Sequence, residues 1–106
     1  MVVRNRNTLE ALHEEHRLLA VLRALQRLPG HAASLLLLRD HLDALGLVTS
    51  HDVMRTEVQH LKEMELCTVN TIDDAYRVTL TERGMDVAEG RSEVEGIRKP
   101  GPECPY

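Results

Sequence analysis

Apolar residues recur every three or four positions through the first third of the chain, which predicts one long amphipathic helix. The series is Leu9, Leu12, Leu19, Leu22, Leu25 and Leu28, with His16 on the same stripe. Such spacing places its members on one helical face. Asn7 or Thr8 can cap the start of this helix, and Pro29-Gly30 ends it. We expect residues 1–7 to form a flexible lead.

A second apolar run, Leu35–Leu45, has the length of a helix and ends at Gly46. A glycine there suits the left-handed conformation that follows many helices. Because Leu35–Leu38 is apolar on every side, we expect this segment to lie centrally in the core. Leu47 and Val48 are expected to fill the core between this helix and the next one.

Ser50 can cap a third helix over residues 51–65, whose apolar stripe is formed by Met54, Val58 and Leu61. Its other face is polar. The short connection between the second and third helices is typical of a helix-turn-helix unit.

The pattern then changes to strand-forming residues. Leu66–Asn70 and Tyr76–Leu80 flank an Asp73-Asp74 turn and predict a β-hairpin. Thr81 can cap a final helix that ends near Gly90 or continues weakly to Val94. The segment 98–106 contains three prolines and cannot be regular. We therefore predict one domain over residues 8–95 and a flexible Pro-rich tail over residues 96–106.

This order of elements is that of a winged helix-turn-helix: a mainly α fold with a three-helix core, a two-stranded wing and a short C-terminal helix. The spacing Val53-x4-Val58-x2-Leu61-x2-Met64-x-Leu66 is followed by the phrase Tyr76-Arg-Val-Thr-Leu-Thr-Glu-Arg-Gly84. In these residues the chain resembles the winged helix-turn-helix superfamily of transcriptional regulators, such as the MarR, PadR and ArsR families. Its compact size and Pro-rich ending are also similar to small winged-helix proteins of Mu-like phages and prophages.

The resemblance implies which residues would face DNA. On the third helix these are Ser50, His51, Arg55, Thr56, Gln59 and His60, directed to the major groove, and on the wing Arg77, directed to a phosphate or the minor groove. Arginine and glutamine can make bidentate contacts with base edges. Ser50 and the helix N-terminus would meet a phosphate through backbone N–H groups. The alternative is that these residues form an ordinary solvated helix face.

Charge argues against DNA binding. The chain of 106 residues has a formal net charge of −4, whereas nucleic-acid modules usually carry an excess of Lys and Arg. The third helix holds more acidic than basic residues, and Asp73 and Asp74 occupy the wing tip. Acidic groups beside phosphates reduce affinity. A second interpretation is therefore an acidic winged-helix module that binds a protein partner and no DNA.

Other classes of function have little support. The sequence contains no Gly-rich phosphate loop and no nucleophile elbow. His13 and His16 do not have the spacing of a zinc protease. We expect no enzyme, no cofactor and no metal site. Cys67 and Cys104 are expected to be reduced thiols of a cytoplasmic protein without a leader or membrane span.

The first hypothesis is thus a DNA-binding transcriptional regulator, acting as a homodimer through its first or last helix. Two recognition helices would then read half-sites about one helical turn apart.

Overall fold

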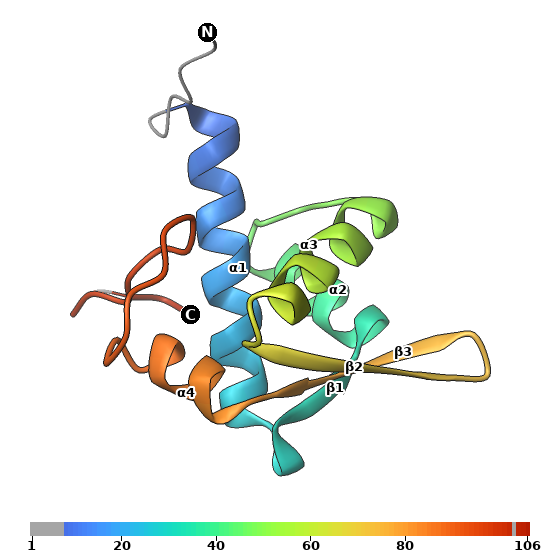
Figure 1. The fold of residues 1–106 in the computed structure, drawn as a ribbon. Helices are drawn as coiled ribbons and strands as arrows, with labels where there is room; N and C mark the ends of the chain where they lie inside the picture. Colours follow the sequence, from blue (N-terminus) through green and yellow to red (C-terminus); the bar gives the residue numbers. More distant parts are fainter. Residues whose placement is uncertain (1–7, 103) are drawn as a thin grey trace, which may run out of the picture.

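Helix α1 (Leu9–Arg27) runs through the middle of the molecule, with α2 and α3 on one side and α4 on the other (Figure 1). The computed structural model describes residues 8–102 and 104–106, and the predicted flexible lead lies outside them. After α1 come β1 (Ala32–Ser34), α2 (Leu35–Ala44), α3 (His51–Glu63), β2 (Cys67–Ile72), β3 (Ala75–Leu80) and α4 (Glu82–Ala88). The described residues thus form a mixed α/β fold of four α-helices and one three-stranded antiparallel sheet.

Each α-helix of the described segment starts at a serine or threonine whose hydroxyl oxygen accepts a backbone N–H of the first turn. Thr8 caps α1, Ser34 caps α2, Ser50 caps α3 and Thr81 caps α4. These bonds satisfy N–H groups that have no partner inside the helix. The predicted caps at Thr8, Ser50 and Thr81 are confirmed. The final helix ends near Gly90, as expected.

The sheet has three strands in the order β1-β3-β2, so the prediction of a two-stranded wing was wrong. The predicted hairpin is present and closes through Asp73 and Asp74, whose φ angles of 48° and 67° suit a tight hairpin turn. The additional strand, β1, pairs Ala33 with Val78 on the outer edge of β3. It has three residues, too few for a periodic pattern, and forms because β3 offers it a free edge.

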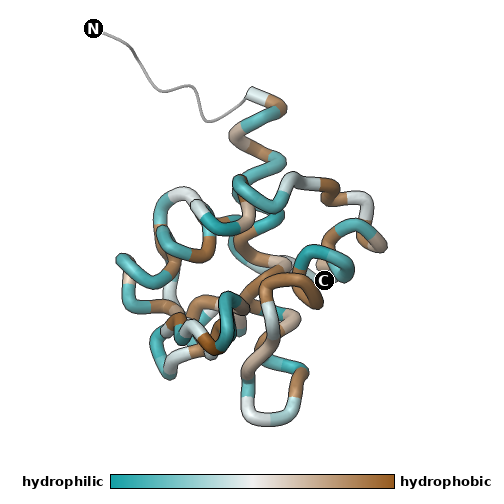
Figure 2. The backbone as a smooth tube through the Cα atoms, turned by 90° about the vertical axis from the view of Figure 1, so that its right-hand side faces the viewer, coloured by the Kyte–Doolittle hydropathy of each residue, from teal (hydrophilic) through white to brown (hydrophobic). Residues whose placement is uncertain are grey.

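The core is aliphatic and is built around α1. Its fully buried large side chains are Leu18, Leu19, Leu22 and Leu25 from α1, Leu38 and Leu42 from α2, Met54, Val58 and Leu61 from α3, and Leu66, Cys67 and Val78 from the β2–β3 region. Apolar and polar segments alternate along the turns of the helices (Figure 2). Cys67 and Cys104 are both free thiols.

Two core expectations were wrong. Leu36 and Leu37 are 63% and 48% exposed, because a helix packed on one side buries only one stripe, here Leu35 and Leu38. Val48 is 63% exposed, and Leu47 alone of the two turn residues packs against the core.

Gly84, near the start of α4, is a position where the structure leaves no room for a side chain. A Cβ atom at this position would overlap the backbone oxygen of Leu66 and the side chain of Leu80. The absence of a side chain lets α4 approach the start of β2, where Leu66 also accepts a backbone bond from Thr81.

The proline-rich segment is irregular, as predicted, but its described residues lie along α1 (Figure 1). Ile97 is buried, and the N–H of Arg98 donates to the oxygen of Glu15 over 3.2 Å. Tyr106 bonds to His16 over 2.8 Å. The boundary at residue 95 and the flexibility of the tail stay predictions.

None of the helices in residues 8–102 and 104–106 combines the length and hydrophobicity needed to cross a bilayer.

Candidate nucleic-acid interface

Helix α3 and the β2–β3 hairpin border a concave surface, which consists of two adjoining hollows. The hairpin projects beyond the helices (Figure 1). The core side of α3 is set by Met54, Val58 and Leu61. Six predicted site residues therefore come together on or at the start of its outer face, and all are exposed: Ser50, His51, Arg55, Thr56, Gln59 and His60. Whether they contact DNA stays a prediction.

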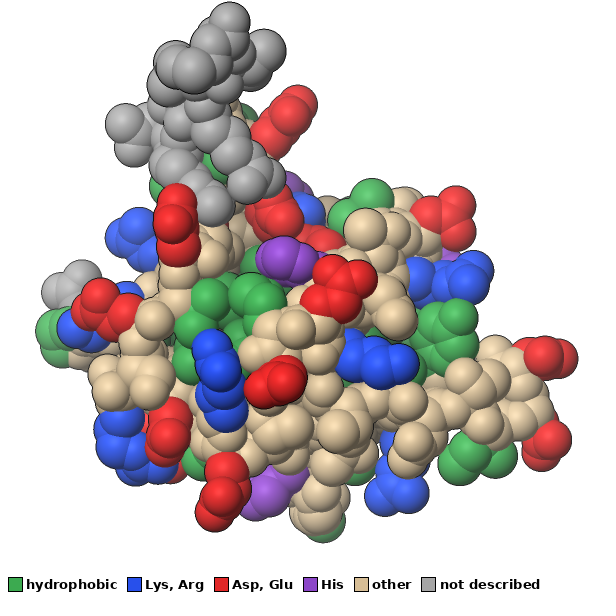
Figure 3. Space-filling view, viewed as in Figure 1, with side chains coloured by type: hydrophobic (Ala, Val, Ile, Leu, Met, Phe, Trp, Pro, Cys, Tyr) green, Lys and Arg blue, Asp and Glu red, His purple; other side chains and the backbone are tan. Residues whose placement is uncertain are grey.

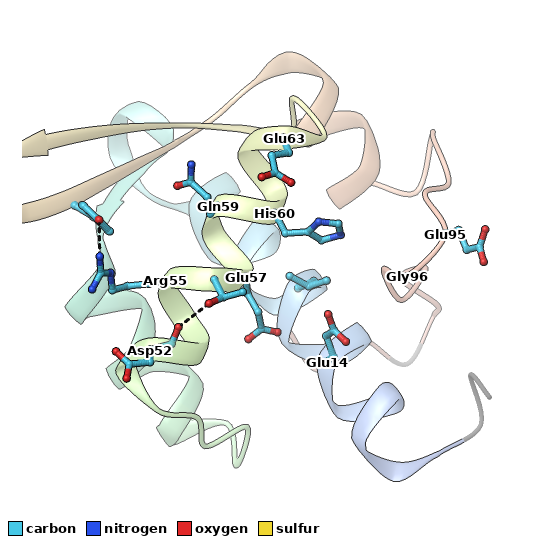
Figure 4. A pocket seen from close by; sticks show the side chains of 12 residues that line it. Glu14, Asp52, Arg55, Glu57, Gln59, His60, Glu63, Glu95 and Gly96 are labelled. Atoms are coloured by element: carbon cyan, nitrogen blue, oxygen red, sulfur yellow. Dashed lines mark hydrogen bonds between the residues drawn. The ribbon is translucent and has the colours of Figure 1, made fainter. Parts of the chain in front are cut away.

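Arg55 is held by the hairpin. Its Nη2 donates to the Tyr76 hydroxyl over 3.0 Å, and its Cζ lies 5.2 Å from the centroid of the Tyr76 ring (Figure 4). Cationic groups at this distance are attracted by the negative face of an aromatic ring. From the sequence pattern, Tyr76 was expected only to be a residue of the second strand of the hairpin. The Arg55–Tyr76 pair joins the predicted recognition helix to the wing.

Two hollows meet at the Arg55–Tyr76 pair. One is a groove of about 860 Å³ between α3, the N-terminal half of α1 and residues 95–96. The other, of about 410 Å³, lies between the start of α3, the start of α2 and the hairpin, where His51 and Asp74 line it. Arg55 and Tyr76 line both. The pair therefore sits at the boundary between the two halves of the concave surface.

Arg77 does not join the other predicted site residues. Successive side chains of a strand point to opposite faces of a sheet. Tyr76 faces α3, and Val78 on the same face is fully buried, so Arg77 lies on the face turned away from α3. Arg77 could meet DNA only from the outer side of the wing.

The polar residues of α3 differ in how free they are. The hydroxyl of Ser50 is used in the helix cap, and the hydroxyl of Thr56 donates to the oxygen of Asp52 over 3.1 Å. Gln59 points to the hairpin side of the helix, whereas His60 points towards α1 and Glu95 (Figure 4). Gln59 and Arg55 thus both lie on the side of α3 that faces the hairpin.

Glu57 is buried. The exposed face of α3 is therefore less acidic than the residue count of the helix suggested. Glu57 is 6% exposed and forms a bidentate ion pair with Arg17 of α1, with Nε–Oε1 and Nη2–Oε2 distances of 2.8 and 3.1 Å. Burial raises the pKa of the Glu57 carboxyl, and the hydrogen bonds from Arg17 oppose this shift. The sequence contained a signal for this burial. Glu57 lies four residues before Leu61, a spacing that places both side chains on the same face of a helix.

Acidic groups nevertheless remain on this surface. Glu14, Asp52, Glu63 and Glu95 line the larger groove together with Arg55 and His60. Figure 3 shows basic and acidic side chains interspersed over the body and acidic ones at the end of the projecting hairpin, where the sequence has Asp73 and Asp74.

The His13 and His16 pair is divided between different surroundings. Nδ1 of His16 bonds to the Tyr106 hydroxyl, while Nε2 of His13 is buried without a hydrogen-bond partner. Burial lowers the pKa of His13, and the charge of Arg17 acts in the same direction. In the part of the chain that the structure describes, no three His, Cys, Asp or Glu side chains are arranged to hold a metal ion.

Comparison with known proteins gives one informative match. The chain is 44% identical over 90 residues to an uncharacterised protein of Escherichia phage Mu, gp26, and the match covers 85% of this chain and 93% of the phage protein. The chain belongs to the gp26 family. This supports the expected relation to Mu-like phages. No protein-family model matches the chain, and no solved structure matches it significantly.

Proposed function

We propose that this gp26-family chain is a winged-helix protein that binds double-stranded DNA and regulates transcription, with α3 entering the major groove. The observation that carries the proposal is an exposed polar face on α3 whose arginine, Arg55, is tied to the neighbouring hairpin. The element order from β1 through α2, α3 and the β2–β3 hairpin supports the proposal, since it matches the order expected of a winged helix.

Arg55 and Gln59 are the proposed base-reading residues. Both are exposed, lie one turn apart on α3, and carry planar polar groups that can bond to two acceptors or donors of one base. His51 and the first N–H groups of α3 suit a phosphate contact, because a helix N-terminus attracts anions.

Homodimer formation remains part of the proposal. A monomer of this size offers one recognition helix, and pairing two of them on successive half-sites is the usual route to specificity. The N-terminal end of α1 extends past the other helices (Figure 1), and Leu9 at this end is 82% exposed. Both features support a contact through α1.

The test uses the purified full-length chain and a pool of randomised DNA duplexes. After selection, affinity for the enriched duplex is measured by fluorescence anisotropy at about 50 and 200 mM salt, because the slope counts phosphate contacts. The size-exclusion mass is measured in parallel. We expect an enriched sequence, an affinity that falls with salt, and loss of specific binding in Arg55→Gln with Gln59→Ala.

Arg83→Gln supplies a control with the same charge change as Arg55→Gln. Arg83 is exposed on α4, a helix that lies far from the projecting end of the hairpin (Figure 1). The Arg83→Gln variant should bind the enriched duplex almost as well as the original chain. If the double variant retains specific binding, the assignment of α3 is wrong.

A second candidate function is an interaction module for a basic protein surface. The acidic lining of the larger groove favours it, since Glu14, Asp52, Glu63 and Glu95 would attract Lys and Arg side chains and repel phosphates. No enrichment of any duplex at the lower salt concentration would replace the first proposal with this one.

A further inference from the structure

Tyr76 is positioned to control how Arg55 is presented. The two side chains come from different elements, 21 residues apart in the sequence, and meet through a hydrogen bond and a cation–π contact. Tyr76 is half-buried on β3, where it faces Thr71 of β2 two residues from the hairpin turn. The ring is thus carried by a paired strand of the sheet, and Arg55 reaches it from α3.

An arginine on a solvated helix face populates many rotamers, and ordering it on binding costs conformational entropy. Contact with Tyr76 restricts the Arg55 side chain before any ligand arrives. Such preorganisation increases affinity because less freedom is lost on binding.

The bond to Tyr76 uses one N–H group of the guanidinium, which has five. The remaining donors retain the forked geometry that matches two acceptors on one edge. In the major groove of DNA the base that offers two acceptors side by side is guanine, through O6 and N7. A phosphate also accepts such a fork, but a phosphate contact carries no sequence preference.

We infer that Tyr76 is a positioning residue that holds Arg55 to read guanine in the major groove, an inference that rests on the proposed DNA binding. The wing thereby contributes to sequence preference without touching the base itself. Arg77, the next residue of β3, has no such role because it lies on the opposite face of the sheet.

The experiment is a double-mutant cycle on the enriched duplex, with Tyr76→Phe, Arg55→Gln and both together. Tyr76→Phe removes the hydrogen bond and keeps the ring, so we expect affinity to fall about threefold to tenfold. In the Arg55→Gln background the same change should have no further effect. Arg77→Gln removes an equal charge from the other face, and its effect should add to that of Tyr76→Phe.

Specificity is measured on duplexes in which single base pairs are replaced. Tyr76→Phe should flatten the preference at one G·C pair, the same pair at which Arg55→Lys loses preference. Arg55→Lys keeps the charge without the fork, so its non-specific binding should persist. Thermal unfolding and amide NMR spectra verify that each variant is folded, and Tyr76→Leu, which also removes the hydroxyl that Arg55 contacts, gives a second route should Tyr76→Phe not fold.

The outcomes separate the two proposals. No duplex binding by the original chain overturns both. Binding by the original chain with full additivity of Tyr76→Phe and Arg55→Gln overturns only the role of Tyr76. If Arg55→Gln lost the same amount of affinity for every duplex, Arg55 would contact a phosphate, and the guanine readout would be overturned.

Discussion

Arg17 on α1 and Glu57 on α3 form a buried bidentate ion pair, with side chains 12% and 8% exposed. The pair fixes the recognition-helix candidate against the central helix. It also neutralises one of the acidic residues that made α3 look unsuited to DNA. Both consequences follow from a contact between residues 40 positions apart.

We predict that Arg17→Met destabilises the fold by roughly 3 kcal/mol near neutral pH, because it leaves the Glu57 carboxylate buried without its partner. Urea unfolding followed by circular dichroism measures this loss. Since burial already raises the pKa of Glu57, folding favours the protonated carboxyl. The contribution of the Glu57 carboxyl to the free energy of unfolding is therefore greatest below its unfolded-state pKa and is lost as pH rises through its folded-state pKa.

Arg17→Met should therefore recover stability as the pH is lowered towards the unfolded-state pKa of Glu57. The control is Arg17→Met with Glu57→Gln, which cannot ionise at this position and should lack that recovery. An identical pH dependence of the two variants would show that Glu57 is not the group responsible.

Gly84→Ala is expected to destabilise the protein by about 1–3 kcal/mol, because the new Cβ would overlap the Leu66 backbone oxygen. The direction of the change in stability is informative, because Gly→Ala at a solvent-exposed position inside a helix usually stabilises the protein. Gly101→Ala is the matched control, as a Cβ at Gly101 meets no atom within 4 Å. A gain in the unfolding midpoint of Gly84→Ala would contradict the close packing of α4 on Leu66.

The negative charge at the hairpin tip can be removed without changing the conformation of the turn. Asp73→Asn with Asp74→Gly keeps residues that tolerate the observed positive φ angles and removes two negative charges. We expect unchanged or higher thermal stability and, if the wing faces DNA, severalfold tighter duplex binding that diminishes at high salt. Glu82→Gln with Glu93→Gln removes equal charge at positions outside the hairpin tip. An equal gain in that control would indicate only a general charge effect.

The segment along α1 can be tested without any ligand. The amide of Arg98 donates to Glu15, and Ile97 is 8% exposed, so we expect the Arg98 amide to be protected from hydrogen exchange. Ile97→Ala should cost about 2–5 kcal/mol. The flexible tail that the sequence predicts over residues 96–106 is the alternative, in which the Arg98 amide would exchange at the rate of an unstructured peptide and Ile97→Ala would be tolerated. Gly101→Ala again serves as the control within the same segment.

Local signals in the sequence determined the elements well. Hydroxyl side chains at Thr8, Ser50 and Thr81 cap the helices that were expected to begin there, and the Asp73-Asp74 turn closes the expected hairpin. Each of these features depends on interactions within a few residues of the chain. The polar face of α3 was visible for the same reason, because helical periodicity alone separates it from Met54, Val58 and Leu61.

Tertiary structure decided everything that depends on what lies opposite a residue. β1 exists because β3 leaves an edge open, and Leu36 is exposed because no other part of residues 8–102 and 104–106 covers the outer side of α2. The sequence could not show that Glu57 meets Arg17 or that Arg55 meets Tyr76, since chain folding brings these pairs together from distant positions. The sequence alone thus determined which segments form helices and strands, and long-range packing decided which of their side chains are held, buried or left free to bind.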